Sequence, residues 1–175
     1  MDESTRGKLL IATPVVGDFF HRTVVLMIEH SDEGAVGVVL NRPSEVRVAD
    51  AVPSLAGAAG DEDVVHVGGP VATQTVLALG DFNDPEAAAT PVTESLGLVD
   101  PDEPDAELTR LRVYAGHAGW GAGQLDGELE AGAWIVADAE NDDPFAEEDV
   151  WPLVLRRQGG RYTLLATMPD DPSLN

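Results

Sequence analysis

The chain has 175 residues, and its 32 acidic residues outnumber the 10 basic ones to give a formal net charge of −22. A hydrophobic content of 43% is typical of a soluble globular protein and excludes wholesale disorder, a collagen-like chain and a membrane protein. Because the chain contains no cysteine, disulfides, thiolate metal sites and cysteine nucleophiles are also excluded.

The length predicts a single domain over residues 1–175, with flexible tails at 1–6 and 169–175. The sequence opens without an export signal and contains no run of ~20 apolar residues, so we expect a cytoplasmic protein that does not enter membranes. The acidic residues concentrate in two intervals without any basic residue, 48–109 and 113–155. Such a field repels phosphate backbones, so direct binding to duplex DNA is not expected.

The clearest predicted element is an antiparallel hairpin near the N-terminus. Residues 23–28 and 36–40 are apolar, β-branched runs, and the segment 29–34 between them is polar and ends in glycine. Neither run alternates with polar residues, so both faces of the hairpin are expected to be covered. The short apolar run 8–12, closed by a Thr-Pro pair, predicts an earlier strand.

The rest of the chain predicts short strands, with helices that come mostly late. Residues 80–107 carry nine acids, four prolines and no base, and predict an irregular acidic excursion on the surface. Strands are predicted at 64–67, 75–79, 110–114, 133–137 and 162–167. Helical segments are predicted at 48–55 (short or broken by Pro53), at 124–130, from Asp143-Pro144 onward, and from an Asp149 cap to Gly159-Gly160.

Two glycine-rich segments have the composition of anion-binding loops. Residues 116–121 are predicted to lie between a strand and a helix, but they match neither the dinucleotide fingerprint nor the P-loop. We interpret them as a sharp turn that packs Trp120. The Gly68-Gly69 turn has the composition of a backbone N–H nest for an anion, although turn geometry alone also explains it.

Four polar residues are predicted to lie at one end of the hairpin, where Glu29-His30 follows the first strand and Asn41-Arg42 the second. An acid, an imidazole, an amide and a guanidinium together suit a polar ligand. The alternative is a Glu29–Arg42 ion pair that stabilises the hairpin end. The four histidines lack the spacing of a helical metal-binding pair, and no G-x-S-x-G nucleophile motif occurs, so no metal, cofactor or catalytic residue is predicted.

Three blocks of residues follow one another in a specific order. They are 20–25 with 29–30 and 34–43, then 68–71, then 118–121 with 123–125, Glu128 and Trp134. Together they resemble the bacterial AlgH/YqgE-like family. The resemblance implies an α+β fold with a bent, barrel-like antiparallel β-sheet wrapped by helices, and no established reaction. The chain departs from the family at His117, where tyrosine is usual, and at Asp126, where glutamate is usual.

The residues of these blocks are mostly of types that set backbone geometry, and few of them supply reactive groups. This favours a non-enzymatic binding or regulatory protein that acts through a protein or small-ligand contact. An enzyme or small-ligand-binding protein, with a polar site near the hairpin end and the Gly68-Gly69 turn, is the alternative. A transcriptional regulator, as the family is often described, conflicts with the charge. We expect the blocks to meet at one place on the surface. The candidate ligand-binding residues are Glu29, His30, Asn41, Arg42, Gly68, Gly69, Trp120, Gln124 and Glu128.

Overall fold

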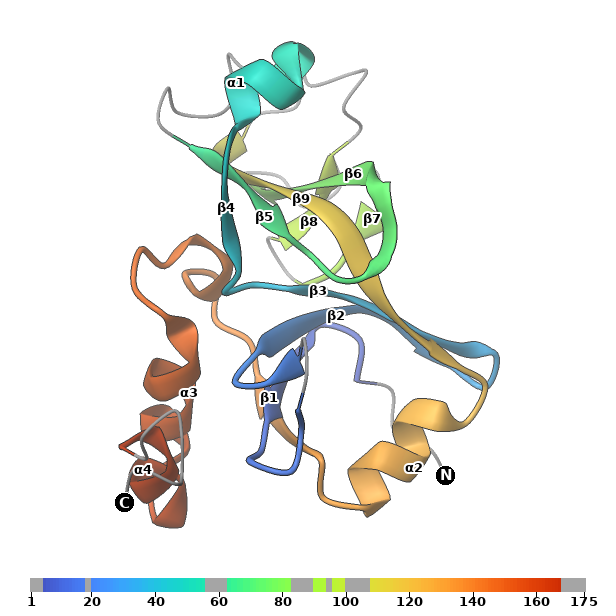
Figure 1. Cartoon of the computed structure of the whole chain (residues 1–175), viewed down its shortest axis with the longest axis vertical. Coiled ribbons are helices and arrows are strands. Elements are labelled where there is room, and N and C mark those ends of the chain that lie inside the picture. The colour runs from blue at the N-terminus through green and yellow to red at the C-terminus, as the bar shows by residue number, and fades with distance from the viewer. Residues whose placement is uncertain are drawn as a thin grey trace.

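A computed structural model describes residues 5–17, 20–55, 63–82, 90–93, 96–99 and 108–167 (Figure 1). The strands are β1 (Lys8–Ala12), β2 (Val24–Ser31), β3 (Gly34–Val39), β4 (Pro43–Arg47), β5 (Val64–Val67), β6 (Val71–Phe82), β7 (Thr90–Pro91), β8 (Leu96–Val99), β9 (Leu108–Gly121) and β10 (Trp134–Asp138). The helices are α1 (Val48–Ala51), α2 (Gln124–Glu130), α3 (Val150–Gln158) and α4 (Arg161–Ala166), with single helical turns at η2 (Pro53–Leu55) and η4 (Asp143–Phe145).

The described strands form one bent sheet in the order β10-β1-β2-β3-β9-β6-β8-β7, with β4 and β5 attached beside β9. Every pair is antiparallel except β5 with β9. In Figure 1 the long strand β9 joins the β1–β3 part of the sheet to the part formed by β5, β6 and β8. The strand order ends at β10 and at β7, so the sheet is not closed into a barrel. The expected α+β fold with a bent, mainly antiparallel sheet is confirmed.

The β2–β3 hairpin separates two hydrophobic cores, because its side chains alternate between its two faces. Val24 and Leu26 belong to the core that α3 covers, whereas Val25 and Met27 belong to the core that contains Trp120. The prediction that both faces of the hairpin are covered is therefore confirmed. Each strand extends further into the polar segment than predicted, which leaves a tight turn between them.

The glycine-rich segment 116–121 lies inside β9, so the prediction of a turn at this place is wrong. Both β3 and β6 pair with this part of the strand. The turn between β5 and β6 approaches it so closely that a Cβ on Gly69 would lie 2.1 Å from the carbonyl carbon of His117. Glycine permits such an approach of two backbones because it has no Cβ.

Two helices form the end of the described chain. The first, α3, begins at the predicted cap, where the carboxylate of Asp149 accepts the N–H of Trp151 at 3.0 Å. The predicted strand at 162–167 is wrong, because Arg161–Ala166 form α4. Tyr162 and Leu165 lie three residues apart and both pack on the core that contains α3. One helix face accommodates that spacing, whereas a strand would turn the two side chains to opposite sides.

Parts of the acidic segment 80–107 belong to the sheet, contrary to the prediction of an irregular excursion. Strand β6 continues to Phe82, β8 pairs with it, and β7 pairs with β8. Other residues of that segment lie outside the described ranges. The short, broken helix predicted at 48–55 is confirmed as α1 and η2. Asp143-Pro144 begins only the single turn η4.

Both predicted tails lie mostly outside the described residues. Within 1–6 the structure describes Thr5 and Arg6, and Thr5 is buried with its N–H donating to Nδ1 of His30 at 3.0 Å. None of 169–175 is described. Among the described helices, none has both the length and the apolar character needed to cross a membrane.

Candidate functional site

The four polar residues predicted at one hairpin end lie at two different places. Glu29 pairs with Val36 beside the turn. Asn41 lies at the open end, where its Oδ1 accepts the N–H of Val24 at 3.0 Å. In an antiparallel hairpin the residues after the second strand lie beside the start of the first strand and far from the turn. The prediction that these residues share one end of the hairpin is therefore wrong.

The alternative, an ion pair between Glu29 and Arg42, does not form either. Arg42 donates to the carbonyl oxygens of Asn41, at 3.0 Å, and of His21. Glu29 is exposed near the turn, and within the described residues Arg42 pairs with no carboxylate. Through these hydrogen bonds Arg42 links the segment after β3 to the segment before β2.

Three other predicted residues hold α2 against the sheet. Glu128 Oε1 accepts the indole N–H groups of Trp120, at 3.1 Å, and Trp134, at 2.8 Å. Gln124 donates to the second carboxylate oxygen of Glu128 at 3.2 Å and accepts the N–H of Gly121 at 3.0 Å. Both indoles are buried and contact each other edge-on. These polar groups bond to one another, and a ligand role for them stays a prediction.

His30 lies on the same side of the molecule as α2. Its Nδ1 accepts the N–H of Thr5, so the neutral ring carries its proton on Nε2, which lies 3.2 Å from the carboxylate of Asp126. His30 thus joins the N-terminal segment, β2 and α2. Asp126 contributes the contact between α2 and this histidine.

The Gly68-Gly69 turn is bonded to both neighbouring strands. The N–H of Gly68 donates to the carbonyl oxygen of Ala115 at 2.9 Å, and its own carbonyl oxygen accepts the N–H of Val39 at 2.8 Å. Turn geometry and the close approach to β9 explain the glycine pair, and an anion-binding role stays a prediction. The three sequence blocks therefore contact one another through β3, β9 and the Gly68-Gly69 turn, and a common surface site formed by them stays a prediction.

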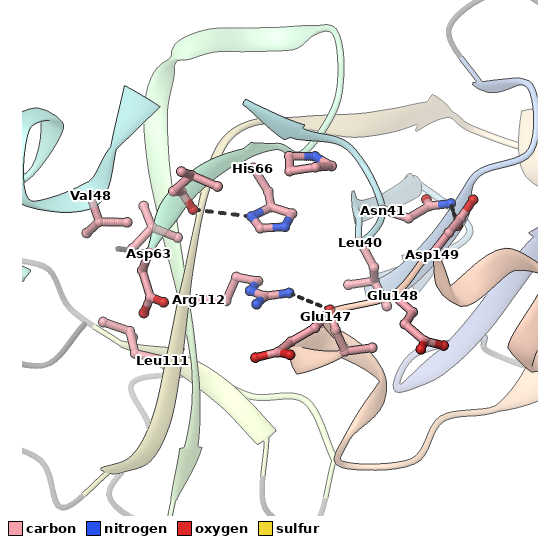
Figure 2. A pocket seen from close by; sticks show the side chains of 14 residues that line it. Leu40, Asn41, Val48, Asp63, His66, Leu111, Arg112, Glu147, Glu148 and Asp149 are labelled. Atoms are coloured by element: carbon pink, nitrogen blue, oxygen red, sulfur yellow. Dashed lines mark hydrogen bonds between the residues drawn. The ribbon is translucent and has the colours of Figure 1, made fainter. Parts of the chain in front are cut away.

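A cavity of about 520 Å³ lies between the β4, β5 and β9 strands and the loop that leads into α3 (Figure 2). This volume lies within the range typical of small-ligand sites. Of the predicted site residues, Asn41 lines it. Its polar lining also includes Asp63, His66, Arg112, Glu147, Glu148 and Asp149, and its apolar lining includes Leu40, Val48, Leu111 and Val113.

Arg112 is held in the wall of this cavity by two backbone carbonyl groups. Its Nη1 donates to the carbonyl oxygens of Pro144, at 2.9 Å, and Ala146, at 3.3 Å. Among the described residues no carboxylate pairs with it, whereas Arg110 on the same strand pairs with two, at 2.8 and 2.9 Å. The carbonyl groups fix the guanidinium and leave its Nε and Nη2 donors for another acceptor.

His66 presents a hydrogen-bond acceptor to the same cavity. Burial, together with the charge of Arg112, lowers the pKa of His66 to about 4, so its imidazole is neutral at neutral pH. Nδ1 lies 3.3 Å from the carbonyl oxygen of Val64. A carbonyl oxygen only accepts, so the neutral ring donates from Nδ1 and keeps Nε2 as an acceptor. Figure 2 shows this ring extending toward Arg112.

Tyr114 adjoins His66, with their ring centres 5.9 Å apart. It is fully buried, and burial raises the pKa of its hydroxyl well above the usual range. That hydroxyl has no hydrogen-bond partner among the described residues. Buried polar groups without a partner are uncommon in proteins because losing water without a replacement bond is costly.

Sequence reasoning missed the polar residues of this cavity apart from Asn41. The alternation at 110–114 predicted a strand, but it gave no indication of what Arg112 would face. The parallel pairing that sets His66 opposite Tyr114 joins segments that are distant in the sequence. A metal site was not predicted, and no group of three or more potential metal ligands occurs in the described ranges.

The chain is similar to proteins of several bacteria. It is 45% identical to a UPF0301 protein of Streptomyces coelicolor, over 98% of this chain and 96% of that protein. It is 34% identical to a UPF0301 protein of Chlorobium limicola, over 99% of this chain and 97% of that protein.

Two solved structures share the fold. Protein DIP2367 from Corynebacterium diphtheriae has a TM-score of 0.86 at 33% identity, covering 95% of this chain and 93% of that one. The AlgH protein from Pseudomonas aeruginosa has a TM-score of 0.71 at 26% identity, covering 97% and 98%. The family model described as AlgH-like matches residues 9–163, and the chain therefore belongs to the AlgH-like family.

Proposed function

We propose that this protein is a non-enzymatic binding protein that holds a small polar ligand in the cavity between β5, β9 and the loop before α3. The observation that carries the proposal concerns the guanidinium of Arg112. Two carbonyl groups orient it, and no carboxylate among the described residues neutralises it. A guanidinium that is fixed in a cavity wall without a carboxylate partner suits an anionic group of a ligand.

The imidazole of His66 supports binding over catalysis. A general acid or base works best when its pKa lies near the working pH. The pKa of His66 is lowered to about 4, so the imidazole keeps one protonation state near neutral pH. It is suited to a fixed hydrogen bond with a ligand, and poorly suited to proton transfer.

The proposal predicts that a ligand stabilises the wild-type protein through Arg112. The test is a thermal-unfolding screen against small carboxylates, phosphates, amines, sugars and nucleosides. A ligand present at 100 times its Kd adds about 2.7 kcal/mol to the free energy of unfolding. We expect Arg112→Met to lose that stabilisation. Arg47→Met, which removes the same charge from the exposed strand β4, serves as the control and should keep it. Failure of every compound, or full stabilisation of Arg112→Met, would contradict the proposal.

Direct binding to duplex DNA is expected to be absent, which separates this proposal from a DNA-binding regulator. Several of the few arginines are already engaged: Arg22 stacks 4.5 Å from the ring of Trp151, and Arg157 pairs with Glu140 and Asp143. The check is a titration of labelled duplex at ~150 mM salt. Saturable binding below roughly 1 μM, tighter than ordinary non-specific binding, would support the regulator instead.

A further inference from the structure

We infer that the ligand of this cavity is an amino-carboxylate with an apolar side chain, a small molecule in which a carboxylate and a protonated amine lie on neighbouring atoms. A free aliphatic α-amino acid has this chemistry. The inference rests on the proposed binding function and names the class of ligand. It follows from the combination of a guanidinium, an imidazole acceptor, carboxylates and an apolar wall around one cavity (Figure 2).

The guanidinium of Arg112 suits a carboxylate better than a phosphate in this setting. The planar donors of arginine match the two oxygens of a carboxylate. Glu147 and Glu148 also line the cavity and form no ion pair among the described residues, so its polar lining carries more negative charge than Arg112 neutralises. A phosphate group bears about two negative charges at neutral pH and would be repelled by these carboxylates more strongly than a singly charged carboxylate would.

The hydrogen-bond acceptors of the cavity favour a ligand that also carries a cationic group. A protonated amine has three donors and no acceptor. Among the described residues, the acceptor Nε2 of His66 has no hydrogen-bond partner, and the carboxylate of Glu147 forms no ion pair. Asp149 is already engaged, because it accepts N–H groups of Asn41 and Trp151. We therefore assign the amine to His66 and Glu147.

Part of the remaining wall is apolar and suits a hydrocarbon side chain. Leu40, Val48, Leu111 and Val113 line the cavity together with the polar groups. In Figure 2 Val48 and Leu111 lie on the side of Arg112 that also holds Asp63, away from Glu147 and Glu148. An aliphatic side chain directed there would be removed from water, while the charged end of the ligand meets the opposite side.

The test is a calorimetric titration of the full chain with four probes. They are L-leucine, 4-methylpentanoate, which lacks the amine, 3-methylbutylamine, which lacks the carboxylate, and inorganic phosphate. We expect saturable binding of L-leucine and at least about tenfold weaker binding of the other three. Arg112→Met should abolish binding of L-leucine. Glu147→Gln should weaken L-leucine about tenfold and should not weaken 4-methylpentanoate, because only the amine is attracted by this carboxylate.

Glu45→Gln is the matched control, because it removes one carboxylate from the exposed strand β4 and should leave every affinity unchanged. Near-ultraviolet circular dichroism shows that each variant is folded. Equal binding of 4-methylpentanoate or phosphate through Arg112 would overturn the amino-carboxylate inference and leave the proposed binding function standing. Absence of L-leucine binding would overturn the inference as well, while the broader ligand screen decides the binding function separately.

Discussion

Replacing Gly69 with alanine is expected to destabilise the protein by more than about 4 kcal/mol, an exceptional loss for one substitution. An added Cβ would lie 2.1 Å from the carbonyl carbon of His117, 2.2 Å from its oxygen and 2.4 Å from the nitrogen of Ala118. These are backbone atoms of β9, and β9 is held by β3 on one side and β6 on the other. The contact therefore cannot be relieved by a side-chain rotation. Urea unfolding followed by circular dichroism measures the loss.

Two further glycine substitutions make the result specific. Gly119→Ala lies on the same strand, where the nearest atom to the new Cβ would be 3.7 Å away, and it should be tolerated. Gly127→Ala lies inside α2 with no atom within 4 Å, and it should stabilise by about 0.5 to 1 kcal/mol through helix propensity. If Gly69→Ala unfolded at the same urea concentration as Gly119→Ala, the close approach of the two backbones would be refuted.

Replacing Glu128 with leucine is expected to cost about 3 kcal/mol, since two hydrogen bonds to a charged acceptor contribute at least ~1.5 kcal/mol each. The carboxylate accepts the indole N–H groups of Trp120 and Trp134, which are only 7% and 6% exposed. Leucine has a similar size but no hydrogen-bond acceptor, so both indole N–H groups would lose the acceptor that Glu128 provides. Equilibrium urea unfolding measures the change in the free energy of unfolding.

Two further variants distinguish the stability that the hydrogen bonds of Glu128 contribute from the effect of removing a negative charge. Glu128→Gln keeps an acceptor oxygen and should lose clearly less than Glu128→Leu. Glu130→Leu changes an exposed residue of the same helix and should alter stability by no more than about 0.5 kcal/mol. Equal stability of Glu128→Leu and Glu130→Leu would mean that the indole hydrogen bonds contribute nothing to holding α2 on the sheet.

Local signals in the sequence predicted several elements of this fold correctly. The apolar runs correctly predicted β1 and the hairpin that is covered on both faces. Asp149 correctly predicted the start of α3, where its carboxylate accepts the N–H of Trp151. The helix 124–130 was predicted with the bounds that the structure has. Each of these signals depends on residues within a few positions of one another, where hydrogen bonding and steric preference act without the rest of the chain.

The errors occurred where distant segments decide the local structure. Residues 162–167 fit a strand by composition, but Tyr162 and Leu165 reach the core of α3 only from one face of a helix. The glycines of 116–121 suggest a turn, but pairing with β3 and β6 keeps this segment within β9. In both places tertiary contacts outweigh a weak local preference.

The sequence by itself determined the family, the acidic character and the class of fold, because these depend on composition and on residue order. Only the tertiary structure decided where the polar residues lie. Antiparallel register separates Glu29 from Asn41, and the parallel pairing of β5 with β9 brings His66 to the cavity wall beside Arg112. Strand register and the docking of the loop before α3 join segments that are remote along the chain, and no local pattern encodes that proximity.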